Sequence, residues 1–367
     1  TSSSATECDE VESEAEDSDK YVRRLLRSFA KRILSPTQKL SYRSQVVEQL
    51  VGNLLDVLQE RLANSFFPLL QPAIGVGSAF EGWSPHGHDA VYRLLVPLKP
   101  PRGHAFRLEL GTAGEMPAKD CRVRVELECT CMKEQLVENT LCFLHHPKEV
   151  LRRNPAASIL GTLCTGSYLD VLKTAQWFQN LVRSAWGEMP QSHHYSMKVL
   201  PSRRSCKLQL TSASGRSLFV EMLFGLQQGD SDVFLSSQNT QAFFTPNTTW
   251  AESYAVAEVK FFRHMARHAP PEALHLKCLQ LFAAVLEGTS FSTYTLKTVM
   301  MHLLNSVPLE RWSRREFLVW LQDILSYLLG CLEEKRLDHF FFGNENMPED
   351  IVLPPVFQMA EPINLFQ

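Results

Sequence analysis

The sequence predicts an α+β fold with two lobes, the first built on a mixed β-sheet and the second built from helices. Three observations lead to this prediction. Strand-like runs of apolar residues occupy the middle of the chain, between about residues 89 and 224. From Trp250 onward the pattern changes to long amphipathic helices. The chain has 367 residues with 44% hydrophobic and 21% charged content, which is enough to bury two cores of moderate size.

The first 20 residues are predicted to form an acidic, disordered tail. They hold eight acidic residues and one basic residue, Lys20, and too few apolar side chains to offset the entropy lost on folding. The formal net charge of the whole chain is −3, and the chain without this tail has 36 basic and 32 acidic residues. Such a small positive surplus is too weak to argue for nucleic acid as a partner, because nucleic-acid binding needs a clustered basic face.

Two helices are predicted between Tyr21 and Leu69, because apolar residues recur there at helical spacing. Pro36 is expected to separate them, since proline removes a helical hydrogen bond and clashes with the preceding turn. The apolar positions are Leu25, Phe29, Ile33, Leu50, Leu54, Leu58 and Leu62.

The central strands come next in the chain. Asp89 to Pro97 is predicted to be a buried strand that ends at the proline. Residues 121–131 alternate between apolar and charged side chains, which is typical of a half-exposed strand. Asp170 is the expected N-cap of a helix that ends near Ala185. Three further strands are predicted at 195–200, 206–210 and 217–224, the last two as a hairpin around a glycine turn.

Four helices are predicted after the strands. A capping box, Ser313 to Glu316, is expected to open the longest of them. The longest apolar stretch, 317–332, is shorter than the roughly 20 apolar residues of a membrane-spanning helix. The predicted helices are Trp250–His268, Pro271–Gly288, Ser292–Asn305 and residues 317 to about 337. The expected division of the chain is 1–20 as the tail, 21–249 as the α+β lobe, 250–342 as the helical lobe and 343–367 as an extension that packs back on the domain.

The stretch from Gly75 to Leu98 carries the clearest functional signal. Gly77 and Ser78 form a turn whose backbone N–H groups can converge on a phosphate, because glycine has no side chain to keep a ligand away. A turn of this kind, followed about ten residues later by strand carboxylates, is how nucleotidyltransferases hold a nucleoside triphosphate over two metal ions.

Nucleotidyl transfer requires three carboxylates, two at positions i and i+2 of one strand and a third on a neighbouring strand. Asp89 fills the second position, and Glu221 is the candidate for the third. The first position is Gly87, which has no side chain to bind a metal. We therefore predict a vestigial nucleotide or metal site at Gly77, Ser78, Asp89 and Glu221, with no catalytic residue and no cofactor.

Two alternatives remain open for these residues. Glu81 could swing in from the turn and replace the missing ligand, in which case the protein is a metal-dependent nucleotidyltransferase. Otherwise Asp89 caps a strand entrance and Glu221 pairs with a buried basic group, which would make the protein a purely structural adaptor.

A second group of residues has the composition of a zinc site. Cys129, Cys131, Cys142 and His146 could form a Cys₃His shell. However, one residue between the first two cysteines is fewer than usual, and free cysteine is often only a small buried apolar residue. The nine cysteines, an odd number spread through the chain, favour reduced thiols in a cytosolic setting. The sequence does not decide whether zinc binds.

These residues and several longer stretches resemble the inositol 1,4,5-trisphosphate receptor-interacting protein family, in the Mab-21 class of the nucleotidyltransferase superfamily, and most closely its like-1 branch. The resemblance runs from about Tyr21 to Gln367. The stretches that carry it are GVGSAFEGW, LCFLHH, LCTGSYLDVLKTAQWF, SCKLQL, HLKCLQL, STYTLKTVMMHLL, RLDHFFFGNE and AEPINLFQ.

The resemblance implies a bilobal nucleotidyltransferase-like fold and a role in binding rather than in synthesis. Family members look like single-pass membrane proteins, so this chain is expected to be the cytosolic domain of a membrane-tethered protein. The family name implies the inositol trisphosphate receptor as the protein partner, and hence a regulatory role in calcium signalling. A nucleotide held between the lobes is compatible with this expectation, whereas nucleic acid is not an expected partner.

Overall fold

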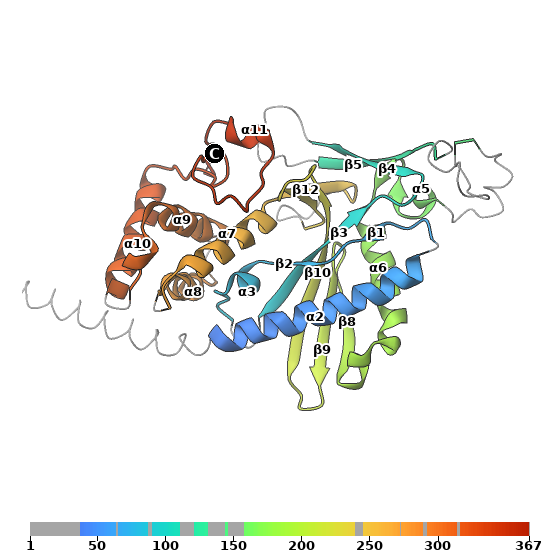
Figure 1. Cartoon of the computed structure of the whole chain (residues 1–367), viewed down its shortest axis with the longest axis horizontal. Helices are drawn as coiled ribbons and strands as arrows, with labels where there is room; N and C mark the ends of the chain where they lie inside the picture. The colour runs from blue at the N-terminus through green and yellow to red at the C-terminus, as the bar shows by residue number, and fades with distance from the viewer. Residues whose placement is uncertain are drawn as a thin grey trace, which may run out of the picture.

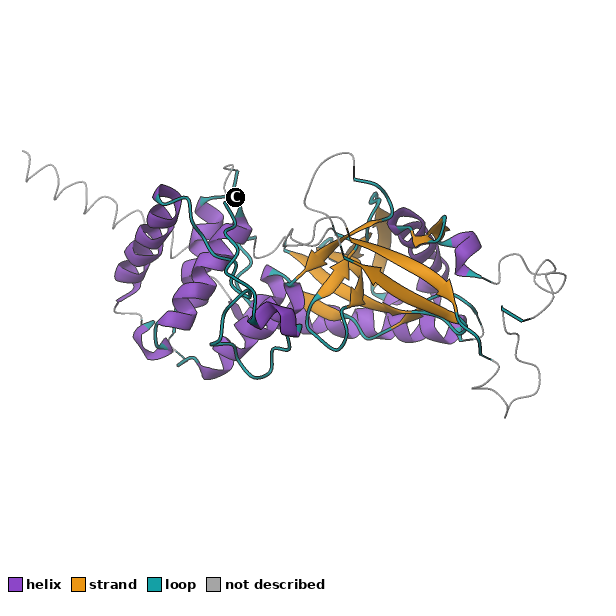
Figure 2. Ribbon diagram, turned by 90° about the horizontal axis from the view of Figure 1, so that it is seen from above, coloured by secondary structure: helices purple, strands orange, loops and turns teal. Residues whose placement is uncertain are grey.

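A computed structural model describes residues 37–63, 65–86, 90–110, 121–130, 144–145, 158–238, 245–271, 273–288, 292–313 and 316–366. The molecule is elongated, with a sheet lobe and a helical lobe side by side (Figures 1 and 2). This arrangement confirms the predicted α+β class with two lobes.

The sheet lobe is organised around β10 (Ser217–Gln227), its longest described strand. β10 runs parallel to β3 (Val91–Lys99) and antiparallel to β9 (Cys206–Ser212), so the predicted hairpin is confirmed. The strands at the two outer sides are β8 (Tyr195–Leu200) on β9, and β1 (Leu69–Leu70) and β2 (Ile74–Val76) on β3.

A curled second part continues the sheet from the end of β10. β11 (Phe234–Ser236) pairs with β10, and β12 (Thr249–Ser253) joins β11 to β5 (Cys121–Leu127). The remaining strands are β4 (His104–Glu109) and β7 (Tyr168–Leu169), both on β5, and β6 (Cys164–Thr165) on β7.

Two helices, α2 (Thr37–Leu62) and α6 (Val171–Ala185), pack against each other and cover one face of the sheet (Figure 1). Phe178 of α6 meets Phe224 of β10 edge-on, with 5.2 Å between ring centres. Asp170 begins α6 as predicted, because its Oδ1 accepts a hydrogen bond from the Lys173 N–H at 3.0 Å. The short helices of this lobe are α3 (Ser78–Glu81), α5 (Ile159–Thr162), η2 (Trp186–Glu188) and η3 (Pro190–His193).

The helical lobe has its own core. Buried in it are the aromatic run Phe340–Phe342 and two residues contributed by the sheet lobe, Trp83 and Val233. Ser292 caps α9, since its hydroxyl accepts from the Tyr294 N–H. The helices are α7 (Ala255–His268), α8 (His275–Val285), α9 (Thr293–Ser306), η4 (Leu309–Arg311), α10 (Phe317–Glu333) and α11 (Pro355–Gln358).

The C-terminal segment folds back along this lobe (Figure 1). Asp338 and Asn364 form an isolated antiparallel bridge. The Leu365 N–H donates to the Leu337 carbonyl at 2.8 Å. These bonds join the end of the chain to the strand-like segment that follows α10.

The prediction that Pro97 ends its strand is wrong. β3 continues through Pro97 to Lys99. Pro97 is the last residue of β3 that pairs with β10, opposite Gly225, and β1 takes over as the partner of Leu98 and Lys99. Proline is accepted here because it lies where one ladder ends, so its missing N–H does not interrupt that ladder.

The predicted helix at Trp250–His268 begins too early. Residues up to Ser253 belong to β12, and α7 begins at Ala255. Trp250 is fully buried, pairs with Cys121 of β5 and donates from its indole Nε1 to the Leu169 carbonyl at 3.1 Å. Long-range pairing therefore overrides the local helical pattern.

Two further expectations about α10 need correction. The residue before the helix is Glu316, and no side chain caps its N-terminus, so the predicted capping box at Ser313 does not form. α10 has 17 residues and is shorter than α2, which has 26. Within the described part of the chain, no helix combines the length and apolar character that a membrane span needs.

Candidate functional site

The predicted Gly-Ser turn lies between β2 and α3. Gly77 has a φ of 79°, in the left-handed region that favours glycine. Its carbonyl accepts from the N–H groups of Phe80 and Glu81, both at 3.0 Å, and these bonds close α3. Gly75 is required for a different reason, because a Cβ there would lie 2.3 Å from the Phe80 ring.

A row of paired residues crosses the sheet beside this turn. Val76 of β2 pairs with Arg93 of β3, Arg93 pairs with Glu221 of β10, and Glu221 pairs with Lys207 of β9. The structure therefore places the turn and Glu221 on the two strands that flank β3. Because strand side chains alternate, Glu221 points to the face opposite Phe224 and away from α6.

Gly87 and Asp89 lie outside the described residues. The structure therefore does not place the two carboxylate positions that the sequence assigns to the entrance of β3. The vestigial site at Gly77, Ser78, Asp89 and Glu221 stays a prediction in that respect.

Both carboxylate oxygens of Glu221 have partners. Oε2 lies 3.2 Å from Nε of Arg93, and Oε1 accepts from the Ser205 hydroxyl at 2.8 Å and lies 3.4 Å from Nζ of Lys207. The side chain of Glu221 is 9% exposed, whereas those of Arg93 and Lys207 are 44% and 43% exposed. Two cations thus neutralise this carboxylate, and a divalent metal ion would have to displace them.

The second notable acid, Glu81, is part of a buried triad. Its Oε1 accepts from Nζ of Lys297 at 2.6 Å, and its Oε2 accepts from the Trp83 indole at 2.6 Å. Lys297 also forms an ion pair with Glu258. The side chain of Glu81 has no exposed surface, and those of Lys297 and Glu258 are 9% and 7% exposed.

Burial dominates the electrostatics of this triad. It raises the pKa of Glu81, while the charge of Lys297 opposes the shift without cancelling it. Burial lowers the pKa of Lys297, but the two carboxylates beside it outweigh this effect and the pKa is raised. A lysine between two acids therefore stays charged in the interior.

The triad joins the two lobes. Glu81 comes from α3 of the sheet lobe, and Glu258 and Lys297 come from α7 and α9 of the helical lobe. Because both oxygens of Glu81 are occupied inside this cluster, the structure gives no support to the alternative in which Glu81 replaces a missing metal ligand.

A pocket of about 880 Å³ lies between the lobes, within the size range of small-molecule sites. α2 and α3 form one side of it, and α7 and α8 form the other. Its charged lining includes Lys277 and Arg263, whose guanidinium group lies 3.2 Å from Glu48. The sequence did not indicate the residues that line this pocket, because α2 and α3 are separated from α7 and α8 by more than 170 residues of chain.

Of the four candidate zinc ligands, only Cys129 lies within the described residues. Cys129 is exposed, and its Sγ lies 3.3 Å from Nδ1 of His145, a residue outside the predicted set. Cys131, Cys142 and His146 lie outside the described residues. Across the described ranges, no three His, Cys, Asp or Glu side chains are grouped to hold a metal ion. Zinc binding by the four candidate residues is neither predicted by the sequence nor tested by the described residues.

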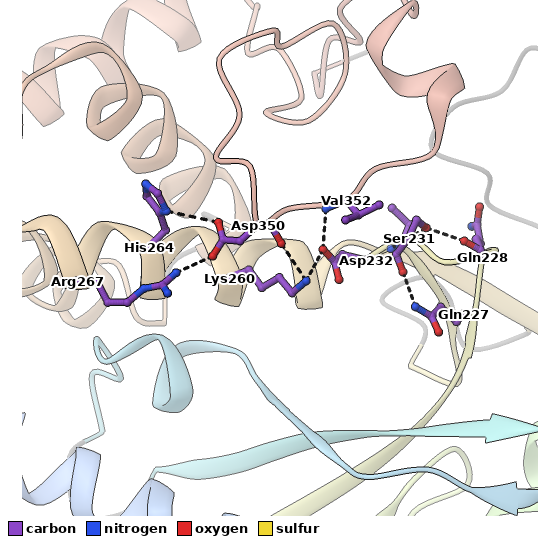
Figure 3. A network of polar contacts seen from close by, with 10 residues as sticks. Gln227, Gln228, Ser231, Asp232, Lys260, His264, Arg267, Asp350 and Val352 are labelled. Carbon is purple, nitrogen blue, oxygen red and sulfur yellow. Dashed lines mark hydrogen bonds and ion pairs between the residues drawn. The ribbon is translucent and has the colours of Figure 1, made fainter.

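A polar network fastens the C-terminal segment to α7 (Figure 3). Nζ of Lys260 donates to Asp232 Oδ2 at 2.8 Å and to the Asp350 carbonyl at 3.0 Å. The Val352 N–H also donates to Asp232 Oδ2, and Arg267 donates to Asp350 Oδ2 at 2.6 Å. One turn of the sheet lobe, one helix and the returning segment are thus held together.

Comparison with known families assigns the helical lobe. Residues 275–361, which include α8 to α11, match the model of the Mab-21 protein HhH/H2TH-like domain. This match agrees with the Mab-21 resemblance of the sequence.

Comparison with individual proteins extends the match to most of the chain. The chain is 35% identical over 353 residues to rat inositol 1,4,5-trisphosphate receptor-interacting protein-like 1, and 36% identical over 333 residues to the mouse protein of that name. It is 30% identical over 361 residues to mouse inositol 1,4,5-trisphosphate receptor-interacting protein. These alignments cover 88–93% of this chain and 61–65% of the relatives, so the chain spans less than two thirds of their length.

Proposed function

Because the chain belongs, over the region compared, to the inositol 1,4,5-trisphosphate receptor-interacting protein family, we propose that it is a non-catalytic interaction module built on a nucleotidyltransferase-like scaffold. The observation that carries the non-catalytic part is the state of Glu221, which is neutralised by Arg93 and Lys207.

The physical argument concerns charge. Two-metal catalysis needs a cluster of free carboxylates that attracts divalent cations. At Glu221 the protein supplies its own positive charges, and Ser205 adds a hydrogen bond to the same carboxylate. A metal ion would have to compensate for the loss of all three contacts, and Gly87 already removes one expected ligand.

The proposed partner is the inositol 1,4,5-trisphosphate receptor, and the proposed role is regulatory. This part rests on the names of the related proteins and on the sequence resemblance. From the resemblance we also propose that a membrane tether lies outside residues 1–367 and that this domain lies on the cytosolic side of the membrane.

Nucleotide binding without catalysis is a second candidate function. The pocket between the lobes favours it, because its volume suits a nucleotide and both Lys277 and Arg263 line it. A bound nucleotide would then be a regulatory ligand of the module rather than a substrate.

An activity and binding assay tests the non-catalytic proposal. The protein is incubated with nucleoside triphosphates and Mg²⁺ or Mn²⁺, and its thermal unfolding is followed with the same ligands; a ligand at about 100 times its Kd adds about 2.7 kcal/mol. We expect no nucleotidyl transfer. We also expect that no ligand stabilises the protein in a metal-dependent way that is lost in Glu221→Gln. Product formation that is lost in Asp89→Ala and in Glu221→Gln would overturn the proposal.

A further inference from the structure

β8 is an edge strand of the sheet lobe. It pairs with β9 alone and lies at an outer side of the sheet (Figure 1). Because alternate backbone groups of an antiparallel strand point away from its partner, half of the N–H and C=O groups of β8 point outward. Among the described residues, only β9 forms backbone hydrogen bonds with Tyr195–Leu200. The outward groups are therefore available to a further strand.

The side chains of β8 are also accessible. None of its six residues is buried, whereas Leu208 on the neighbouring strand β9 is fully buried. Val199 pairs with Leu208, so Val199 and Met197 lie on the sheet face that α6 covers. Lys198 lies on the opposite face and is exposed. The edge thus has an apolar side and a basic side.

The surroundings of this edge are basic. Residues 189–220, all of which the structure describes, contain no Asp or Glu. Within the described part of the chain, the exposed side chains of Lys198, Arg203 and Arg216 form no ion pair. The basic residues of this stretch are Lys198, Arg203, Arg204, Lys207 and Arg216. An occupant of the edge therefore meets positive charge.

The nearest acid on the same sheet face does not cancel this charge. Glu221 lies on β10, which β9 separates from β8. Its side chain is 9% exposed and is shared by Arg93 and Lys207. Lys198 lies nearer to the edge, as a diagonal neighbour of Lys207 on this face. Its charge is therefore free for an incoming residue.

We propose that β8 binds an extended acidic segment of a protein partner, which joins the sheet as an additional strand. The free backbone edge favours a polypeptide, because neither a nucleic acid nor a lipid headgroup supplies the row of N–H and C=O groups that extends a sheet. The charge favours an acidic one. An acid opposite Lys198 forms a cross-strand pair, whereas lysine on an edge opposes the addition of an uncharged or basic strand.

The two sides of β8 also predict the pattern of the bound segment. Neighbouring strands align their side chains on each face of a sheet. Acidic residues of the segment should therefore lie beside Lys198, and should alternate with apolar residues that lie beside Met197 and Val199. A second copy of β8 lacks the acids of this pattern. The inference rests on the proposed function as an interaction module, and adds the place of binding and the chemistry of the segment bound.

Synthetic peptides test the proposal on the whole chain, residues 1–367. The probe is a short soluble peptide in which Glu and Val alternate, and two comparison peptides carry Gln or Lys in place of Glu. At saturation the Glu peptide should slow the exchange of the outward amides of Tyr195–Leu200 at least about tenfold. At low salt it should bind at least about tenfold more tightly than the Gln peptide.

Charge reversal tests the same contacts from the protein. Lys198→Glu with Arg203→Glu should weaken binding of the Glu peptide at least about tenfold. The same variant should bind the Lys peptide, which shows that its edge is still folded. The matched control is Lys99→Glu with Arg311→Glu, which makes the same change of charge at exposed residues elsewhere. It should leave the binding of the Glu peptide unchanged.

Several results would overturn the proposal. Equal binding of the Glu and Gln peptides would remove the role of charge, and binding without slower exchange in β8 would remove the role of the edge. Outward amides that already exchange slowly in dilute protein would mean that the chain covers its own edge. Slowing that grows with protein concentration alone would assign the edge to a second copy.

Two further comparisons separate this inference from other conclusions. Tighter binding of a single-stranded oligonucleotide or of anionic vesicles, lost in Lys198→Glu with Arg203→Glu, would assign the surface to that class of partner and overturn the proposal. Receptor binding that this variant leaves unchanged would overturn the docking site and leave the proposed function intact. Peptide binding at β8 without receptor binding would support the docking site and contradict the proposed partner.

Discussion

At the scale of single residues, Lys297 is a buried cation held between two buried carboxylates. Replacing it with methionine leaves Glu81 and Glu258 buried without a cation. Removal of one partner of a buried ion pair costs about 3–5 kcal/mol, so we expect Lys297→Met to lower the free energy of unfolding by that amount. Urea unfolding measures the loss.

The matched control for this change is Lys277→Met at the pocket between the lobes. Lys277 lines an open pocket and is not part of the buried triad, so its loss should change the free energy of unfolding by no more than about 0.5 kcal/mol. Equal losses of stability in the two variants would show that the buried triad does not stabilise the fold.

His339 gives a prediction about pH. It is fully buried, its Nδ1 accepts from the Phe341 N–H, its Nε2 lies 3.0 Å from the Tyr294 hydroxyl, and burial lowers its pKa to about 3. The unfolded chain protonates this histidine near pH 6.5 but the folded protein does not, so stability must fall as the pH falls from 6.5 toward 3. Because of this histidine, the free energy of unfolding should be about 2 kcal/mol lower at pH 5 than at pH 7.

Urea unfolding at pH 7 and pH 5 checks this expectation. His339→Gln keeps polar atoms in place but does not titrate, so it should lose less stability over this interval than the natural protein does. An equal loss in both proteins would assign the acid sensitivity to other groups.

Single residues also show how far the sequence predicts the site. Glu81 and Glu221 were both recognisable as candidate metal ligands, and pairing with a basic group was one interpretation of Glu221. Their partners were not recognisable, because Lys297 lies 216 residues from Glu81 and Arg93 lies 128 residues from Glu221. Only the folded chain brings these charges together.

At the scale of elements, α6 depends on its first residue. Asp170 is 3% exposed and accepts from the Lys173 N–H and from the Thr165 hydroxyl. Asp170→Ala should lower the free energy of unfolding by about 1–2 kcal/mol, because it leaves both donors without this acceptor. Chemical unfolding of the variant measures the effect.

Asp170→Asn is the matched control for α6, since asparagine is an equally good N-cap residue. It should retain at least half of the stability that alanine loses. A loss for asparagine as large as that for alanine would show that the negative charge, which both variants lack, rather than the cap hydrogen bond, holds this position.

The elements that were predicted well share a property. α2, α6, α9 and the hairpin of β9 with β10 each carry their signal within their own residues, through helical periodicity, an N-cap or a glycine turn. β12 was missed because its strand character comes from pairing with β5 and β11, while its local pattern continues into α7. β4 was missed for the same reason, since it is defined by its register with β5.

At the scale of the whole molecule, the two lobes are joined by buried contacts rather than by a linker alone. Trp83 and Val233 of the sheet lobe lie in the core of the helical lobe, and the buried triad crosses the same boundary. We therefore expect a single cooperative transition in calorimetry, and the same single transition at a lower temperature in Lys297→Met. Two transitions in the natural protein would contradict this coupling.

The bilobal α+β architecture was predictable because the change from strand pattern to helix pattern near residue 250 is visible in composition. The contacts between the lobes were not predictable, because they join α3 to α7 and α9, and a single sequence contains no record of such distances. The lining of the pocket between the lobes was not predictable for the same reason.

The central claim is that this domain binds a protein partner without metal chemistry. The most direct test is a calorimetric titration of the purified cytosolic part of an inositol 1,4,5-trisphosphate receptor with this chain, in Mg²⁺ and in EDTA. The account predicts saturable binding with the same Kd in both buffers and in Glu221→Gln. Absence of binding, or binding that requires divalent metal and Glu221, would contradict it.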